Sequence, residues 1–142
     1  MKKVLCFVTV FIFLSISIFS SLSFANDSAK KEAVLSAINW IKLVDAGKYG
    51  KSWDTASTIF KNEISKNEWN KALKKVLSPL GKVISRKVAT THYTKTLPGA
   101  PDGQYVVIQF KTSFENKKSA IETITPMIDK DGKWRVSGYY IK

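Results

Sequence analysis

The sequence contains a single cysteine, Cys6, near the start of a chain of 142 residues. A lone cysteine forms no disulfide within the chain, and it supplies neither a paired-thiol redox motif nor a thiolate metal site. The only histidine is His92, so a zinc site would need several carboxylates around it. The sequence also lacks a serine nucleophile elbow, a phosphate-binding glycine motif and a complete calcium loop. We therefore expect no metal and no cofactor.

Arginine is scarce, although the chain is strongly basic. Lysine and arginine together number 23 against 11 acidic residues, for a net charge of +12, yet Arg86 and Arg135 are the only arginines. Lysines attract polyanions, but they lack the planar guanidinium fork that binds phosphates and bases in a fixed geometry. This composition argues against sequence-specific binding of nucleic acid and predicts a mild general attraction to anionic partners.

The longest apolar run lies at the N-terminus. Lys2 and Lys3 precede an apolar segment from Val4 to Phe19, and Ser23-Phe24-Ala25 then offers small residues at the two positions that a signal peptidase reads. This order is typical of a cleaved secretory signal, and the apolar segment is short for a membrane span of about 20 residues. We expect cleavage after Ala25, which divides the chain into a signal peptide (1–25) and a single domain (26–142). The mature protein would be periplasmic or secreted, without a membrane anchor.

Apolar residues recur at helical spacing in the first half of this domain. A first helix is predicted from Ser28 to Ala46, and a shorter second helix from Tyr49 to Phe60. The third helix has the clearest start, because Ser65 to Glu68 has the pattern of a capping box. Its apolar stripe continues from Trp69 to Leu77 and stops before Pro79.

After these helices the pattern changes to the alternation of β-strands. Four strands are predicted: Val83–Lys95, Tyr105–Phe114, Ile121–Ile128 and Trp134–Ile141. Between the first two lies LPGAPDG (97–103), in which Pro98-Gly99 suits the centre of a type II turn. We interpret this segment as a hairpin connection, because a phosphate-binding loop would be followed by a helix and not by a strand. Helices followed by strands predict an α+β fold, in which three helices pack on one face of an antiparallel sheet of about four strands.

Two carboxylates deserve comparison as possible acid–base groups. Asp45 falls within the apolar sector of the first helix, and Glu122 shares a strand face with Ile124. A carboxylate inside an apolar pocket can have a raised pKa and serve as a proton shuttle. The alternatives are that Asp45 lies in a frayed last turn and that Glu122 pairs with a lysine across the sheet. The residues define no catalytic set, and a conventional enzyme is not indicated.

Aromatic and charged residues supply the candidates for a ligand-binding pocket. They are Trp40, Trp53, Arg86, Tyr105, Glu122 and Tyr140. For the two tryptophans the alternative is packing in the core. For Arg86 it is a structural ion pair in place of an anion-binding role.

Several segments together resemble a known family. They are Trp53, Phe60 and Trp69, SPLG (78–81) with Arg86, LPGAPDGQYVVIQFKTSF (97–114), Glu122, and the ending DGKWRVSGYYIK (131–142). Over nearly the whole mature chain these residues resemble the bacterial family called domain of unknown function 4019. The resemblance implies an exported bacterial protein whose fold is similar to the nuclear transport factor 2-like, or cystatin-like, cone. In that fold three helices close over a strongly curved antiparallel sheet. The resemblance implies no particular activity.

Three functions are consistent with these features. The favoured one is a non-enzymatic accessory domain of the cell envelope that binds a small ligand or an envelope protein, as a monomer or a homodimer. The second is a small-molecule isomerase, dehydratase or hydrolase that uses Glu122 or Asp45 as its base, which requires the acid to lie deep in a pocket beside a tyrosine. Buried tyrosines such as Tyr105, Tyr139 or Tyr140 could donate to a ligand, and the alternative is that they satisfy a local acceptor. The third is an electrostatic binder of anionic envelope polymers, whose affinity would fall steeply with salt.

Overall fold

A computed structural model describes residues 17–142 and shows an α+β fold, as the sequence predicts. Helices come first: α1 (Ser17–Asp45), α2 (Tyr49–Thr55), α3 (Thr58–Glu63), α4 (Lys66–Leu77) and a short 3-10 turn (Ser78–Leu80). The strands follow: β1 (Val83–Thr94), β2 (Tyr105–Phe114), β3 (Lys117–Ile128) and β4 (Trp134–Ile141). The described residues contain no helix that combines the length and the apolar character needed to cross a membrane.

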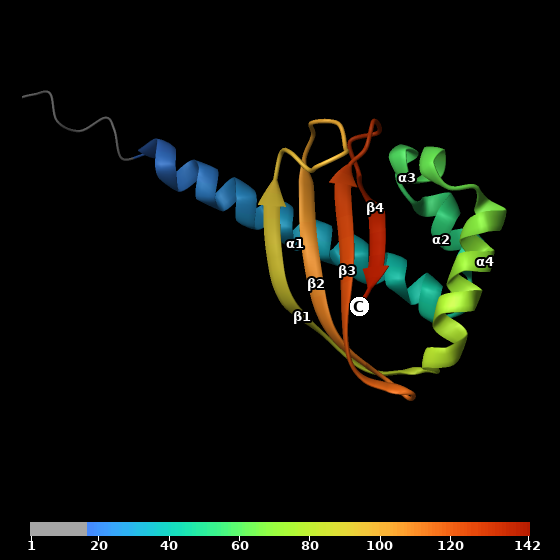
Figure 1. The fold of residues 1–142 in the computed structure, drawn as a ribbon. Helices are drawn as coiled ribbons and strands as arrows, with labels where there is room; N and C mark the ends of the chain where they lie inside the picture. Colours follow the sequence, from blue (N-terminus) through green and yellow to red (C-terminus); the bar gives the residue numbers. More distant parts are fainter. Residues whose placement is uncertain (1–16) are drawn as a thin grey trace, which may run out of the picture.

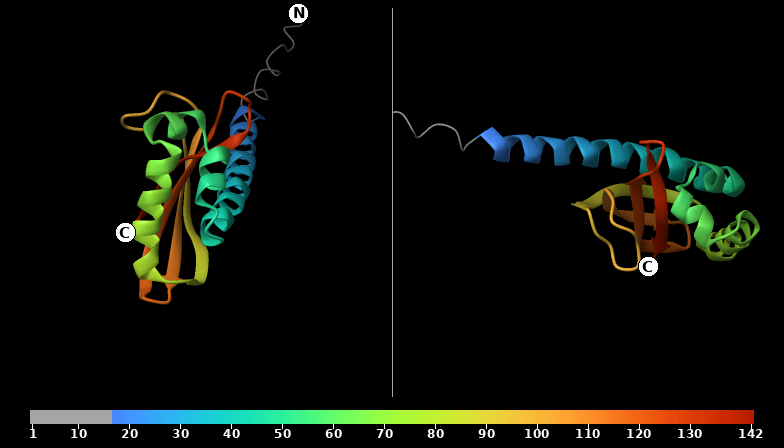
Figure 2. Two further views of the ribbon diagram at one scale, coloured as in Figure 1. Left: turned by 90° about the vertical axis from the view of Figure 1, so that its right-hand side faces the viewer. Right: turned by 90° about the horizontal axis from the view of Figure 1, so that it is seen from above.

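The four strands form one antiparallel meander in the order β1-β2-β3-β4, and α1 crosses behind the sheet (Figure 1). Helix α4 lies beside β4 in the same view, with α2 between α4 and α1 (Figure 2). One face of the sheet, the inner face, is therefore covered by α1, whereas the opposite, outer face is open. This arrangement agrees with the helices-on-one-face packing expected from the order of elements.

The core forms where α1 meets the inner face of the sheet. Trp40, Ile41 and Val44 of α1 are buried against apolar side chains of the strands, which are Val106, Ile108, Phe110, Ile124 and Val136. Trp40 also belongs to an aromatic cluster with Phe60, Trp69 and Tyr139, whose ring centroids lie 4.8–6.4 Å apart. Tilted and edge-to-face pairs at these distances stabilise a core beyond the burial of their area.

Helix α1 begins earlier than the sequence pattern predicts. It starts at Ser17 and not at Ser28, because the intervening residues include neither glycine nor proline to interrupt a helix. This added part projects past the sheet (Figure 2), and Leu22 and Phe24 there are 59% and 74% exposed. Residues 1–16 of the predicted signal peptide lie outside the described residues.

The second predicted helix is divided in two. Helix α2 ends at Thr55, and Ser57 adopts an extended conformation from which its Oγ accepts a hydrogen bond from the Phe60 backbone N–H (3.2 Å). The backbone N–H of Ser57 also donates to the carbonyl oxygen of Val136 in β4 (2.9 Å). Serine is a preferred N-cap, so the chain ends one helix and begins another at this residue.

The other predicted boundaries match closely. The capping box of α4 is confirmed: Ser65 Oγ accepts from the Glu68 N–H (3.3 Å), and Glu68 Oε2 accepts from the Ser65 N–H (3.0 Å). Hydrogen bonds from Ser65 lower the pKa of Glu68. Strands β2 and β4 have the predicted bounds, and β1 ends one residue early. Strand β3 starts at Lys117, earlier than the predicted Ile121, because Lys117 already pairs with Phe114 across a tight turn.

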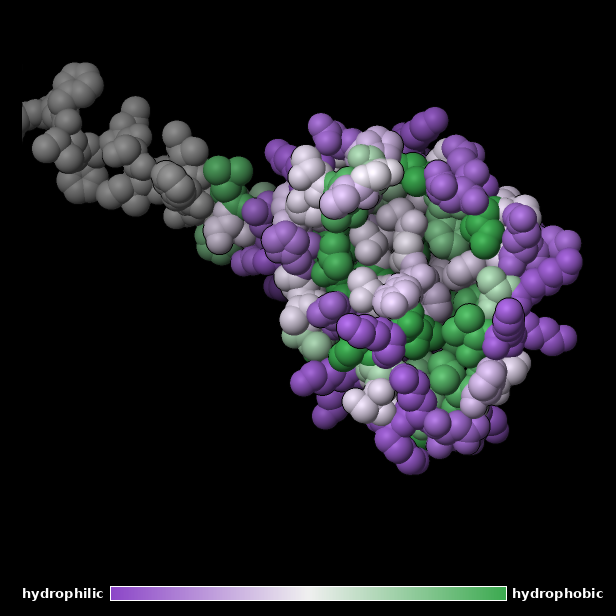
Figure 3. Space-filling view, in the orientation of Figure 1, coloured by the Kyte–Doolittle hydropathy of each residue, from purple (hydrophilic) through white to green (hydrophobic). Residues whose placement is uncertain are grey.

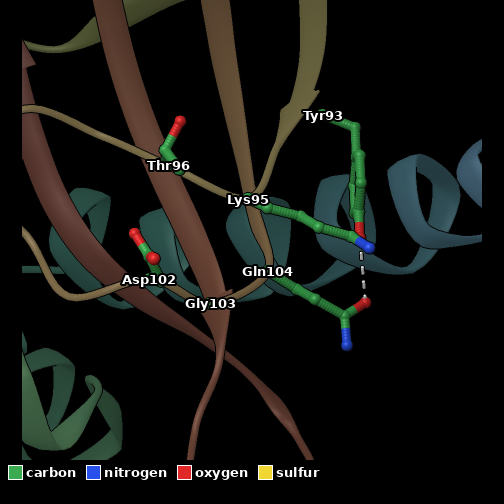
Figure 4. Close-up of a pocket in the computed structure, with 6 residues that line it drawn as sticks. All are labelled: Tyr93, Lys95, Thr96, Asp102, Gly103 and Gln104. Carbon is green, nitrogen blue, oxygen red and sulfur yellow. Dashed lines mark hydrogen bonds between the residues drawn. The ribbon is translucent and has the colours of Figure 1, made fainter.

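The LPGAPDG segment is a hairpin connection between β1 and β2, as predicted. The Ala100 N–H donates to the Leu97 carbonyl oxygen (3.2 Å), and Gly99 has a φ of 76°, which is the value that a type II turn requires at its third residue. A shallow hollow beside the segment is lined by Tyr93, Lys95, Thr96, Asp102, Gly103 and Gln104. Figure 4 shows that Thr96 and Asp102 point away from the group formed by the other side chains. The polar side chains that line the hollow therefore do not all converge on one point, and we do not assign the hollow as a site.

Candidate functional site

A buried carboxylate, Glu122, lies at the centre of the most polar part of the core. Its side chain is fully buried in the middle of β3. It accepts hydrogen bonds from Arg86 Nε (2.7 Å) and Nη2 (3.3 Å), from Thr112 Oγ1 (2.5 Å) and from Tyr139 Oη (2.5 Å). A carboxylate has about four lone-pair positions. All of them are occupied by donors from β1, β2 and β4.

The pairing of the strands explains how these donors reach Glu122. Arg86 lies opposite Thr112 in the β1–β2 ladder, and Glu122 lies opposite Phe110 in the β2–β3 ladder. Tyr139 is opposite Ile124, two residues along β3 from Glu122. All of these side chains lie on the inner face of the sheet, because residues at alternate positions of a strand share a face.

Arg86 connects this cluster to the last turn of α1. Its Nη1 and Nη2 donate to the two carboxylate oxygens of Asp45, at 2.7 and 3.0 Å, in a bidentate ion pair. Burial by itself lowers the pKa of Arg86, but the hydrogen bonds to Asp45 and Glu122 outweigh it and hold that pKa above its ordinary value. One guanidinium is therefore shared between two carboxylates, and the trio carries a net charge of about −1.

Tyr139 remains a hydrogen-bond donor under ordinary conditions. Burial raises the pKa of its hydroxyl, and the negative charge of Glu122 raises that pKa further. Thr112 is also buried and donates to the same carboxylate. We refer to Asp45, Arg86, Thr112, Glu122 and Tyr139 as the Glu122 network.

A cleft of about 580 Å³ opens beside this network, between the ends of α1 and α4 and the start of the sheet. Its volume lies within the range of small-molecule sites. Apolar and aromatic side chains form about half of its wall, with Asp45, Lys82 and Glu115 as the charged members. The apolar ones are Val44, Tyr49, Leu77, Val83, Phe114 and Tyr139. Figure 3 shows apolar surface in the region between the sheet and α4. The Asp45 side chain is 33% exposed, whereas that of Arg86 is 13% exposed, so Asp45 presents the charge of the network to the cleft.

Among the residues singled out from the sequence, the structure brings Arg86, Glu122 and Asp45 together. The tryptophans serve other contacts. Trp40 is buried, and its Nε1 donates to the Ser52 carbonyl oxygen (2.8 Å), while Trp53 Nε1 donates to the Ile64 carbonyl oxygen (2.8 Å). Both indole N–H groups are thus used within the helical layer.

The two candidate tyrosines lie away from the cleft. Tyr105 is 1% exposed, and its hydroxyl donates to the Pro101 carbonyl oxygen (2.6 Å) beneath the β1–β2 connection. Tyr140 is 62% exposed and pairs with Thr123 on the outer face of the sheet. The sequence analysis considered Tyr139 only as one of three tyrosines that could donate to a ligand, and it did not single out Thr112. Thr112 lies on the same face of β2 as the apolar Phe110 and Phe114. A polar residue at a position where the alternation places apolar ones is the signal that could have identified it.

Within residues 17–142, no group of three or more histidine, cysteine, aspartate and glutamate side chains is placed to hold a metal ion. The negative charge of the Glu122 network is neutralised in part by Arg86, which occupies the space between the two carboxylates. The network therefore acts chemically as an ion-pair cluster.

Comparison with known proteins gives one assignment. A comparison with curated proteins finds no match. The model of a family described as "Protein of unknown function (DUF4019)" matches residues 36–139, a range that includes the whole Glu122 network and the whole wall of the cleft. The broader likeness to the nuclear transport factor 2-like cone stays an expectation. The chain belongs to the family described as Protein of unknown function (DUF4019).

Proposed function

We propose that the chain is an exported accessory domain of the bacterial cell envelope, which binds a small amphipathic molecule in the cleft beside Asp45 and performs no catalysis. The observation that carries this proposal is the complete hydrogen bonding of Glu122. Its carboxylate accepts from Arg86, Thr112 and Tyr139 while fully buried. A general base needs a free lone pair within reach of a substrate proton, and this carboxylate has none.

Asp45 differs from Glu122, because its carboxylate is one-third exposed at the cleft and keeps free lone pairs, but it is held in an ion pair. Both of its carboxylate oxygens accept hydrogen bonds from Arg86. Taking a proton from a substrate would weaken this bidentate pair and leave the guanidinium of Arg86 without one of its two counter-charges. An isomerase, dehydratase or hydrolase needs its acid deep in a pocket beside a tyrosine, and Glu122 does lie beside Tyr139. Because Glu122 has no free lone pair and does not line the cleft, and Asp45 is paired with Arg86, we disfavour this alternative.

The lining of the cleft indicates the chemistry of its ligand. The wall is apolar over about half of its surface, and the net charge of the adjoining trio, Asp45, Arg86 and Glu122, is about −1. An apolar body with a protonated amine or another hydrogen-bond donor directed at Asp45 would complement both features. A neutral apolar molecule would cover the exposed part of that carboxylate without replacing the hydrogen bonds it makes to water.

Native mass spectrometry of the protein, purified from its own host without denaturation, tests this proposal. We expect a reproducible additional mass that is lost on unfolding. Ser78→Phe places a ring at the mouth of the cleft, from an exposed residue that lines it, and is expected to abolish the additional mass. Ser28→Phe makes the same change on the exposed N-terminal part of α1 and should leave it unchanged. A bare protein, or equal retention in both variants, would count against the cleft as a binding site.

Export is tested separately, by the mass of the protein recovered from outside the cytoplasm. Cleavage after Ala25 should leave a chain of residues 26–142. Leu22 and Phe24, on the N-terminal side of this position, are exposed, and helix α1 runs through the junction. Ala25→Leu introduces a bulky residue at the position before the cut and should yield the uncleaved chain. The control Ser28→Leu should be cleaved normally. Recovery of an intact N-terminus in the unmodified protein would exclude the predicted signal cleavage.

A further inference from the structure

The outer face of the sheet carries a row of three lysines. Lys87 of β1 lies directly opposite Lys111 of β2, which is opposite Ile121 of β3. The row is completed by Lys142, because the backbones of Ile121 and Lys142 exchange two hydrogen bonds, at 3.0 and 2.9 Å. Neighbouring strands lie about 4.8 Å apart, so the row spans roughly 14 Å. All three lysines are exposed.

Polar side chains form the next row of the same face. Thr90 is opposite Gln109, Gln109 is opposite Thr123, and Thr123 is opposite Tyr140. Hydroxyl, amide and phenol groups thus lie beside the lysine row. Figure 3 shows this face with strongly hydrophilic side chains near the C-terminal end of β4 and residues of intermediate hydropathy beyond them. Together the two rows form what we call the lysine–hydroxyl face.

Nothing in the fold accounts for these charges. Two like charges directly opposite each other on a sheet lower its stability, and Lys87 and Lys111 are such a pair. Among the described residues, the basic partners in salt bridges are Lys66, Arg86 and Arg135, none of which belongs to the row. None of the acidic residues in the four strands lies on this face, since the only one, Glu122, faces the core.

We infer that the lysine–hydroxyl face binds an extended anionic polymer of the cell envelope, in which phosphodiester groups alternate with polyol or sugar units. Charge complementarity carries the inference, because the face presents cations alone in a protein whose net charge is +12. Lysine ammonium groups can follow a chain of phosphates without reading a sequence. The second row offers hydrogen bonds to the hydroxyls between the phosphates. The choice of an envelope polymer rests on the proposed export of the protein.

Single-stranded nucleic acid has the same backbone charge but fits this face less well. Proteins that bind it stack successive bases on several aromatic side chains. In the described part of the chain, Tyr140 is the one large aromatic side chain of the strands that is exposed. One aromatic ring does not make a stacking platform, so the hydroxyl-rich polymer is the better match.

The test measures binding of the full chain to fluorescein-labelled poly(glycerol phosphate) by fluorescence anisotropy at several salt concentrations. We expect the triple variant Lys87→Gln/Lys111→Gln/Lys142→Gln to bind at least about tenfold more weakly at 50 mM salt. The slope of log affinity against log salt should fall in magnitude by about 2, as expected when three contacts to a single-stranded polyanion are lost. Tyr140→Ala should lower affinity without changing this slope.

A matched control separates this face from the effect of net charge. Lys71→Gln/Lys74→Gln/Lys75→Gln removes the same charge from exposed positions of α4 and should bind about as well as the unmodified protein. An equal loss in this control, or no binding by the unmodified protein, would overturn the inference. Tighter binding of single-stranded DNA of equal charge would overturn the choice of polymer.

Because Lys87 and Lys111 oppose each other, Lys111→Gln should not lower the melting temperature, so weaker binding cannot be attributed to unfolding. The assay needs neither export nor an open cleft. A negative result here is therefore distinguishable from a failure of the proposed export or of ligand binding in the cleft.

Discussion

Replacing Glu122 with glutamine is expected to lower the free energy of unfolding by about 3–5 kcal/mol, the range seen when one partner of a buried ion pair is removed. The Glu122 side chain is fully buried and receives four hydrogen bonds. An amide of the same shape offers one oxygen, and it turns an NH2 group toward donors. Arg86 would also lose its more deeply buried counter-charge.

Urea unfolding followed by tryptophan fluorescence measures this change, because the chain has four tryptophans. Asp45→Asn is the matched control: it removes the other carboxylate held by Arg86, but from a side chain that is one-third exposed. Its cost should stay near 1 kcal/mol, since water compensates an exposed partner. If Glu122→Gln cost no more than Asp45→Asn, the network would not be the polar centre of the core.

Replacing Trp40 with alanine is expected to lower the free energy of unfolding by about 3–5 kcal/mol as well. This ring is buried at the centre of the aromatic cluster, within 5.5–6.4 Å of the rings of Phe60, Trp69 and Tyr139. Its removal leaves a cavity that several rigid rings cannot readily fill. The Ser52 carbonyl oxygen also loses the hydrogen bond from the indole N–H (2.8 Å).

The control for this prediction is Trp53→Ala, which removes the same side chain from a partly buried position at the edge of the core. We expect it to cost about 1–2 kcal/mol, in proportion to the smaller apolar area lost. Both values come from the same urea titrations. Comparable costs for the two variants would mean that Trp40 contributes no more to the core than a peripheral ring.

These two predictions concern one structural unit, because Tyr139 belongs to both. Its ring contacts Trp40 and Trp69, and its hydroxyl donates to Glu122. The aromatic cluster and the Glu122 network therefore hold α1, α4 and the sheet together from adjacent positions. A rigid wall of this kind suits a binding cleft, because the side chains beside Asp45 are already ordered before any ligand arrives.

Part of the fold was predictable because its signals are local. The capping box at Ser65 and Glu68 and the type II turn at Pro98-Gly99 each depend on residues no more than three positions apart. Strand β2 was predicted with its exact bounds, since its alternation continues over its full length. The division between α2 and α3 was missed, because the apolar spacing continues across Ser57, whereas the Ser57 hydroxyl caps the start of a new helix, α3.

The candidate site was predictable in its residue types but not in its connections. Glu122, Arg86 and Asp45 stood out as charged residues in otherwise apolar patterns. Tyr139 was considered as a possible donor, but a strict alternation from the buried Val136 would place Tyr140, and not Tyr139, on the same face. The β3–β4 ladder shifts register between Thr125 and Pro126, and this irregularity brings both Val136 and Tyr139 to the inner face. A bulge of this kind reverses the orientation of every residue beyond it.

By itself, the sequence determined the order of helices and strands, the α+β class, the turn at LPGAPDG and the excess of positive charge. These properties follow from composition and from interactions between residues close in the chain. Only the tertiary structure decided that Glu122 is fully hydrogen-bonded and that Lys87 faces Lys111. The partners of Glu122 include Arg86, which is 36 residues away, and Arg86 in turn reaches Asp45 across 41 residues. Such distant groups meet only when strand register and helix packing are set together, and no local pattern encodes that geometry.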